Sequence, residues 1–238
     1  MFERPHHLRI AKLLQFFNAE LLQDAKCYFG GGTAIVLSLG EYRESIDVDF
    51  LCSSKEGFRV LRNTVTMQSL GALLREPVPH RRDVRSERDK IATFLDVDGA
   101  PVKVEFLLEG NLEISGSFDP VFQVPTLSRE DMYATKLLAN ADRGLDKSTL
   151  SRDIIDLAMM IDHWGDIPES AWTKAKAAYG GHVVRAYHRS CELICDQTYL
   201  IGCLRKMHME EGLVERLPEV LECSPRLDAD DHDSAWKP

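Results

Sequence analysis

Two short segments carry most of the information in this chain: Phe29-Gly30-Gly31-Gly32-Thr33-Ala34 and, after a gap, Ser45-Ile46-Asp47-Val48-Asp49-Phe50. Glycine lets a backbone approach a phosphate closely. If Thr33 opens a helix, the unpaired N–H groups and positive dipole end of that helix face the phosphate. Asp47 and Asp49 alternate on an expected strand, so both carboxylates project from one face and offer hard oxygen ligands to a divalent metal.

Each half of this pattern has a simpler explanation when it is taken alone. A Gly-Gly pair is most often a turn, and two acids alternating along a strand are most often its solvated face. The joint pattern demands more, because it needs a glycine turn, a helix and an acid-faced strand in that order. Carboxylates placed in this way can hold the metal ions that organise in-line phosphoryl transfer.

Hydrophobic periodicity divides the chain near Pro125 into a mixed half and a helical half. The expected helices of the first half cover 7–26, 34–39 and 55–74, and the expected strands cover 46–52, 91–97, 102–108 and, at an edge, 121–124. Asp98-Gly99 is a strong hairpin signal between two of these strands. From Ser128 onward only helices are expected. We therefore predict a domain at 1–125, a helical domain at 126–224 and an acidic flexible tail at 225–238.

Composition places the chain among ordinary folded proteins. It has 238 residues, of which 44% are hydrophobic and 28% charged, and this excludes a disordered or fibrous chain. No run approaches the roughly 20 apolar residues of a membrane span, and the N-terminus lacks a signal peptide. Six cysteines without CxxC spacing predict free thiols in a reducing cytoplasm. We expect a cytoplasmic protein with no membrane contact.

The net charge of −9 argues against nonspecific binding of duplex DNA, which depends on neutralising phosphates. One segment, 75–90, is nevertheless rich in cations, and it also carries four acids. Arg81, Arg82 and Arg85 are its best candidates for contact with RNA. A solvated loop remains an equally good interpretation of this segment.

Several motifs in order resemble the nucleotidyltransferase AbiEii/AbiGii toxin family, a branch of the polymerase-β-like nucleotidyltransferase superfamily. They are the glycine motif, Gly40-x-x-Arg43-x-Ser45-x-Asp47-Val48-Asp49, Asp131-Met132-x-x-x-Lys136-Leu137-x-Ala139-x-x-Asp142-Arg143, and Ser151-Arg152-Asp153-Ile154-x-Asp156-Leu157. The resemblance covers about residues 27 to 162. It implies an α+β fold, in which a mixed sheet with helices is followed by a C-terminal all-helical region.

The resemblance also implies roles for individual residues. Asp47 and Asp49 would hold metal, with Glu105 as the third carboxylate on a later strand. Asp96 has the same acid spacing but no preceding glycine turn, so it is at most a supporting acid. The residues implied in binding the NTP are Gly31, Gly32, Thr33, Arg43, Ser45 and Lys136. Asp153 would orient Arg152 or Lys136, or act as a base.

Two of these residues have simpler explanations. Without the resemblance, Lys136 is better explained as a surface lysine on an amphipathic helix. Asp153, with Asp142, Arg143 and Arg152, is more simply a salt-bridge network between helices.

The implied activity is transfer of an NMP from an NTP to an acceptor hydroxyl, with Mg²⁺ or Mn²⁺ as cofactor and pyrophosphate as the second product. The implied setting is a bacterial toxin–antitoxin or phage-defence pair with a cognate antitoxin, and the implied acceptor is the 3′ end of tRNA. Three alternatives stay open. The acceptor could be a protein hydroxyl, the domain could be an inactive nucleotide-binding module, or the substrate could be a small molecule, which the toxin motifs disfavour.

Overall fold

One mixed seven-stranded sheet organises the first half of the computed structural model, which describes residues 2–222. Its strand order is β3-β4-β5-β2-β1-β7-β6, with parallel pairs at β2/β5 and β1/β7 and antiparallel pairs elsewhere. The strands are β1 (Cys27–Gly30), β2 (Asp47–Cys52), β3 (His80–Ser86), β4 (Lys90–Val97), β5 (Ala100–Leu108), β6 (Gly116–Asp119) and β7 (Val124–Leu127). The expected α+β class is confirmed.

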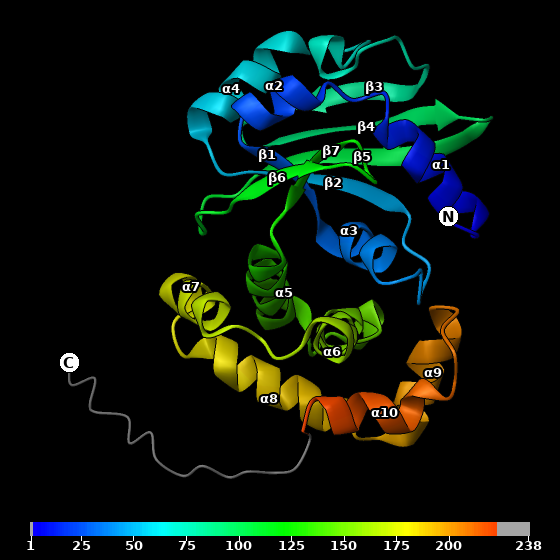
Figure 1. Ribbon diagram of the computed structural model, residues 1–238, viewed down its shortest axis with the longest axis vertical. Helices are drawn as coiled ribbons and strands as arrows, with labels where there is room; N and C mark the ends of the chain where they lie inside the picture. Colours follow the sequence, from blue (N-terminus) through cyan, green and yellow to red (C-terminus); the bar gives the residue numbers. More distant parts are fainter. Residues whose placement is uncertain (1, 223–238) are drawn as a thin grey trace.

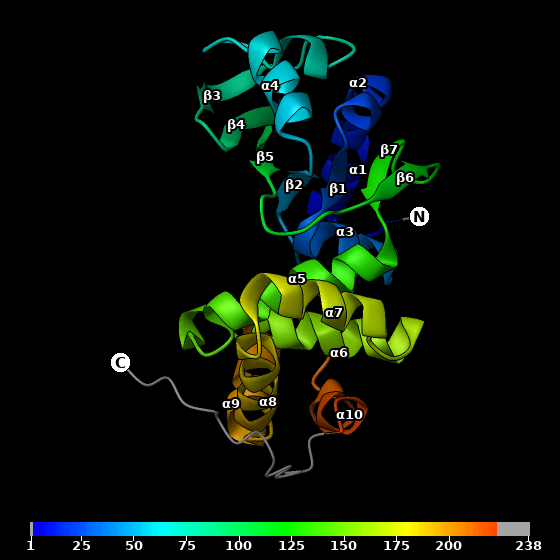
Figure 2. The ribbon, with the colours of Figure 1, turned by 90° about the vertical axis from the view of Figure 1, so that its left-hand side faces the viewer.

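Helices lie on both sides of this sheet (Figure 1). One face packs against α1 (Pro5–Leu14), α2 (Ala19–Asp24) and α4 (Lys55–Thr64), and the other against α3 (Gly31–Ser38). The second half of the chain is helical: α5 (Arg129–Arg143), α6 (Arg152–Trp164), α7 (Glu169–Tyr179), α8 (His182–Ile194), α9 (Gln197–Lys206) and α10 (Leu213–Val220), with 3-10 turns at Gly71–Leu73 and Lys147–Thr149. Figure 2 shows this helical body beneath the sheet, in contact with α3 through α5 and α6. Within residues 2–222, no helix is both long and apolar enough to cross a lipid bilayer.

The alternation of β2 fixes which face of the sheet is core and which carries the acids. Val48, Phe50 and Cys52 are buried, whereas Asp47 and Asp49 are partly exposed on the opposite face. On the core side, the Phe50 ring contacts those of Phe17, Phe29 and Phe106, with centroids 4.9 to 5.9 Å apart. These aromatic contacts pack the central strands on their core side, and the acids lie on the other face.

Three expected elements are shorter or placed differently. The helix expected at 7–26 is interrupted, because the Asn18 side chain accepts a hydrogen bond from the Leu21 N–H and starts α2 afresh. The helix expected at 55–74 ends at Thr64 and is followed by a turn in which Gly71 has φ of +56°. The strand expected at 121–124 is wrong: residues 121–123 form a turn, and β7 lies inside the sheet between β1 and β6.

The structure also adds features that the sequence patterns did not predict. Part of the basic segment 75–90 is the edge strand β3, so it is not a loop throughout, and β6 forms the other edge. Cys27 lies opposite Cys52 and forms a disulfide with it, which corrects the expectation of free thiols for these two cysteines. The last strand ends at Leu127 and α5 begins at Arg129; the division into separate domains stays a prediction. The acidic tail expected at 225–238 lies outside the described residues.

We expect Phe50→Ala to lower the free energy of unfolding by about 3–5 kcal/mol, because it removes a fully buried ring from the aromatic cluster and leaves a cavity. Urea denaturation monitored by circular dichroism measures this. Phe118→Ala is the matched control, since its ring is 49% exposed on β6. Equal losses in the two variants would contradict the core assignment.

Candidate active site

Three carboxylates gather on the acid face of two neighbouring parallel strands. Asp47 and Asp49 come from β2 and Glu105 from β5, with Glu105 directly opposite Asp49 in the register. Two lysines accompany them. Lys103 Nζ lies 2.8 Å from Glu105 Oε2 and 3.5 Å from Asp47 Oδ2, and Lys90 Nζ forms a second ion pair with Glu105. The structure therefore brings together the three acids that the sequence singled out.

The carboxylates are electrostatically unlike one another. Burial, together with repulsion by the charges of Asp47 and Glu105, raises the pKa of Asp49 to about 6. Burial also acts to raise the pKa of Glu105, but hydrogen bonds from Lys103 and Lys90 outweigh it and hold that pKa below its usual value. The charge of Asp49 is therefore less well compensated than that of Glu105.

The chemistry of these side chains fits a divalent cation. Asp47 and Asp49 present hard oxygen donors on one face, and a cation there would relieve the repulsion that raises the pKa of Asp49. Among residues 2–222, no three His, Cys, Asp or Glu side chains form a ready-made metal cage, and Glu105 is engaged by lysines instead. Asp47 and Asp49 are thus the better-placed ligands.

The glycine turn leaves no room for side chains beside these acids. Gly31 has φ of +68°, and a methyl group there would lie 2.7 Å from Asp49 Oδ2. A methyl group on Gly32 would lie 2.6 Å from Arg43 Nη2. Helix α3 begins at Gly31, and no side chain caps its N-terminus. The N–H groups at this end therefore lie next to the acid strand and can donate hydrogen bonds to a bound anion.

Two hydroxyls fix the loop that leads into the acid strand. Thr33 Oγ1 donates a hydrogen bond to the carbonyl oxygen of Asp47 and lies 2.8 Å from Ser45 Oγ. Thr33 is buried, so its side chain holds the backbone of the loop and is not directed at open solvent. Both residues were expected to bind the NTP, and in this structure their hydroxyls are paired with each other.

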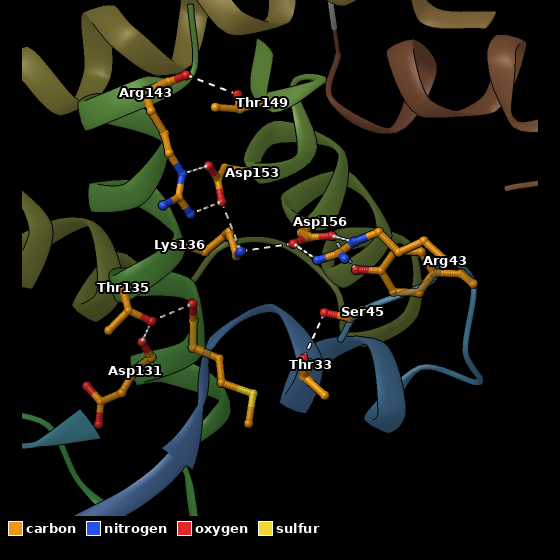
Figure 3. A network of polar contacts seen from close by, with 12 residues as sticks. Thr33, Arg43, Ser45, Asp131, Thr135, Lys136, Arg143, Thr149, Asp153 and Asp156 are labelled. Carbon is orange, nitrogen blue, oxygen red and sulfur yellow. Dashed lines mark hydrogen bonds and ion pairs between the residues drawn. The ribbon is translucent and has the colours of Figure 1, made fainter. Parts of the chain in front are cut away.

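A buried ionic network, drawn in Figure 3, lies against the glycine turn, because a methyl group on Gly32 would meet both Arg43 and Asp156. The Asp156 carboxylate on α6 accepts two hydrogen bonds from Arg43, each 2.7 Å long, and one of 2.6 Å from the Tyr42 hydroxyl. Lys136 Nζ on α5 bridges Asp156 Oδ2 at 2.9 Å and Asp153 Oδ1 at 3.0 Å. Arg143 closes the chain of contacts on Asp153.

This network changes the interpretation of three candidate residues. Lys136 is buried, so it is not the surface lysine that the helix pattern alone favours. Asp153 holds Lys136 and Arg143, which agrees with both the expected orienting role and the interhelical salt-bridge network. Arg43 is buried and its guanidinium is hydrogen-bonded to Asp156. Its charge therefore acts on the glycine turn through the electric field and not through direct contact with a ligand.

Sequence reasoning placed Asp156 on one helical face with Asp153 but gave the functional role to Asp153, whereas Asp156 lies at the centre of the network. Although burial acts to raise the pKa of Asp156, Arg43 and Lys136 hold it well below its usual range. The sequence did hold a signal, since Asp153 and Asp156 are three residues apart on one helix and share a face. Asp96, by contrast, accepts a hydrogen bond from Gly99 N and pairs with Arg81, so it serves the hairpin.

The family model of the nucleotidyl transferase AbiEii toxin, type IV TA system, matches residues 13–222. The chain belongs to this family and is a nucleotidyltransferase. No curated protein matches it. Among solved structures, a Helicobacter pylori protein assigned as a nucleotidyltransferase is similar, with 15% identity, a TM-score of 0.52 and coverage of 91% of this chain and 92% of its own. JHP933 from Helicobacter pylori is similar too, with 14% identity, a TM-score of 0.51 and coverage of 93% and 92%. These likenesses confirm the nucleotidyltransferase fold.

The raised pKa of Asp49 has a consequence for stability. The folded protein binds this proton more tightly than the unfolded chain does, so the contribution of Asp49 is favourable at low pH and is lost as pH rises through about 6. We therefore expect Asp49→Asn to stabilise the metal-free protein by about 1–3 kcal/mol at pH 7.5 and by much less at pH 4.

Urea denaturation in EDTA at the two pH values measures this difference. Asp24→Asn, exposed on α2, is the control for loss of one negative charge. A stability difference between wild type and Asp49→Asn that does not change with pH would contradict the arrangement of charges described here.

Proposed function

We propose that the protein transfers an NMP from an NTP to the 3′-hydroxyl of an RNA, with tRNA as the expected acceptor and Mg²⁺ or Mn²⁺ as cofactor. One observation carries this proposal: the Asp49 carboxylate, on the same strand face as Asp47, lies against the glycine turn at the uncapped N-terminus of α3. Backbone N–H groups that can bind a triphosphate therefore lie next to carboxylates that can bind a metal ion, as nucleotidyl transfer requires.

The triphosphate would lie on the Gly31–Gly32 turn. Backbone N–H groups at the start of α3 bind its oxygens, and the network behind the turn adds positive charge. Three cations, Arg43, Lys136 and Arg143, share two carboxylates there, so the network keeps an excess of one positive charge. Arg43 and Lys136 thus attract the triphosphate through their field as positioning residues.

The reaction joins the acceptor to the α-phosphate. The acceptor oxygen attacks the α-phosphorus, a new P–O bond forms, and the bond from that phosphorus to the bridging oxygen of the β-phosphate breaks, releasing pyrophosphate. Glu105, kept ionised by Lys103 and Lys90, accepts a hydrogen bond from the attacking hydroxyl and orients it, and the hydroxyl proton passes to solvent. A divalent cation held by Asp47 and Asp49 would supply charge neutralisation for the phosphates.

The charges near the site favour RNA as the acceptor. By register, Arg82 and Arg85 on β3 share the face of the sheet that carries the catalytic acids. Arg81 is committed to Asp96 and to the carbonyl of Gly99, so it is the weakest of the three expected contacts. Two exposed arginines on the acid face suit a polyanion that must approach the carboxylates.

The biological setting follows from the family. Membership of a type IV toxin–antitoxin family supports a role as a toxin that is paired with a cognate antitoxin. The proposal is that RNA modified at its 3′ end can no longer serve translation, which stops growth. Phage defence is one use to which such a pair is suited.

We expect Asp49→Asn to lower nucleotidyl transfer by several orders of magnitude, because it removes one charge from the metal ligands and keeps the shape of the side chain. The assay is incubation with each α-labelled NTP, Mg²⁺ and total RNA, followed by a gel. Asp96→Asn is the matched control and should retain activity. Label on protein instead of RNA would overturn the choice of acceptor, and equal losses in both variants would overturn the choice of acids.

Charge reversal tests the RNA contact. Arg82→Glu combined with Arg85→Glu should weaken RNA binding and reduce the slope of log K against log salt by about 1.4, if each arginine neutralises one phosphate. NTP affinity, measured by calorimetry, should stay the same. Arg59→Glu, exposed on α4 across the sheet, is the control. Filter binding at several salt concentrations that gives an unchanged slope would show that β3 is merely solvated.

A further inference from the structure

The face of the sheet that carries the catalytic acids continues beyond them as two rows of side chains. The register places Asp47, Lys103, Phe94 and Arg82 side by side across β2, β5, β4 and β3. The next row is Asp49, Glu105, Ala92 and Arg85. Residues opposite one another in a sheet point to the same face, so the members of both rows on β5 and β4 share one surface with the carboxylates. The pairing of β3 is irregular at Arg82 and Arg85, and the contact of Arg82 with the Phe94 ring places Arg82 on this surface. Arg85 follows Val84, which is buried on the core face.

This part of the surface is open. Lys90, Ala92, Phe94 and Asp96 on β4 are all partly exposed, and they alternate with buried residues. Figures 1 and 2 both place β3 and β4 at the end of the sheet that lies away from α5 to α10. The surface is therefore reachable by a macromolecule that also reaches the catalytic acids.

Phe94 is the unusual member of these rows. Among the described side chains, it belongs neither to the hydrophobic core nor to the partly buried shell packed on it. Its ring contacts the guanidinium of Arg82, whose central carbon lies 4.6 Å from the ring centroid. A partly exposed aromatic ring with an arginine against it, among cations, is the combination by which proteins stack the bases of single-stranded nucleic acid.

We propose that Phe94, with Arg82, forms a shelf that stacks one base of the single-stranded 3′ end of the acceptor RNA. The inference rests on the proposed function and names how that acceptor is held. Phe94 lies two strands from Asp47, a span of ~10 Å. A base stacked there leaves the 3′-terminal hydroxyl within reach of the carboxylates. Arg82, at the edge of the shelf, and Arg85 contact the neighbouring phosphates, so the shelf positions the strand without reading its sequence.

The first test is Phe94→Ala, with Phe94→Trp as the conservative variant. Loss of one stacked base should raise the KM for a short single-stranded RNA with a free 3′-hydroxyl by about 5- to 100-fold. The KM for NTP should not change. Phe94→Trp should restore the acceptor KM, and Phe118→Ala, an exposed aromatic on the opposite edge strand, should leave it unchanged.

The second test separates stacking from a merely structural role. A set of RNAs is prepared, each with one abasic site at a different 3′-terminal nucleotide. The KM for each RNA is measured with wild type and with Phe94→Ala. At one position the missing base should weaken wild type but not the variant, because both changes remove the same contact. Equal sensitivity of the two proteins at every position would overturn the shelf.

The outcomes also distinguish the inference from the function on which it rests. If wild type transfers label to RNA and Phe94→Ala keeps the wild-type acceptor KM, the shelf is wrong and the proposed function stands. If wild type labels protein and not RNA, the proposed function fails and the shelf falls with it. Thermal denaturation of each variant shows whether it is folded.

Discussion

The arrangement of the candidate site depends on the contacts made by the buried carboxylate of Asp156. It lies on α6, yet it binds Arg43 from the loop before β2, Tyr42 beside it and Lys136 on α5. A buried charge is tolerated only when its partners are in place, and removing one partner typically costs about 3–5 kcal/mol. The carboxylate therefore connects the helical half of the chain to the loop that precedes the acid strand β2.

The second organising feature is the register of the sheet. Because β2 and β5 run parallel with Asp49 opposite Glu105, three carboxylates converge without any loop having to carry them. Metal ligands placed on paired strands are held more rigidly than ligands placed on loops. The same register extends outward through β4 and β3, so that the three carboxylates, two lysines, an aromatic ring and arginines share one surface. The proposed catalysis and the proposed acceptor binding therefore both depend on one alignment of strands.

Local patterns predicted the parts of the site that are local in sequence. Alternation across Asp47-Val48-Asp49-Phe50 was enough to assign the acid face, and Asp98-Gly99 was enough to assign the hairpin. The role of Asp156 could not be found in this way, because its main partner Arg43 is 113 positions away. The strand β3 was missed because only Val84 in it is buried, so it lacks a hydrophobic alternation. The disulfide depended on the register of β1 with β2, which no spacing rule reveals.

The most direct test of the account is a crystal structure with Mn²⁺ and a non-hydrolysable NTP analogue, with the metal located by its anomalous signal. The account predicts Mn²⁺ bound by Asp47 and Asp49, with the triphosphate on the Gly31–Gly32 turn and the Arg43–Asp156 pair still intact behind it. Manganese bound elsewhere, or a triphosphate that displaces Arg43 from Asp156, would contradict it.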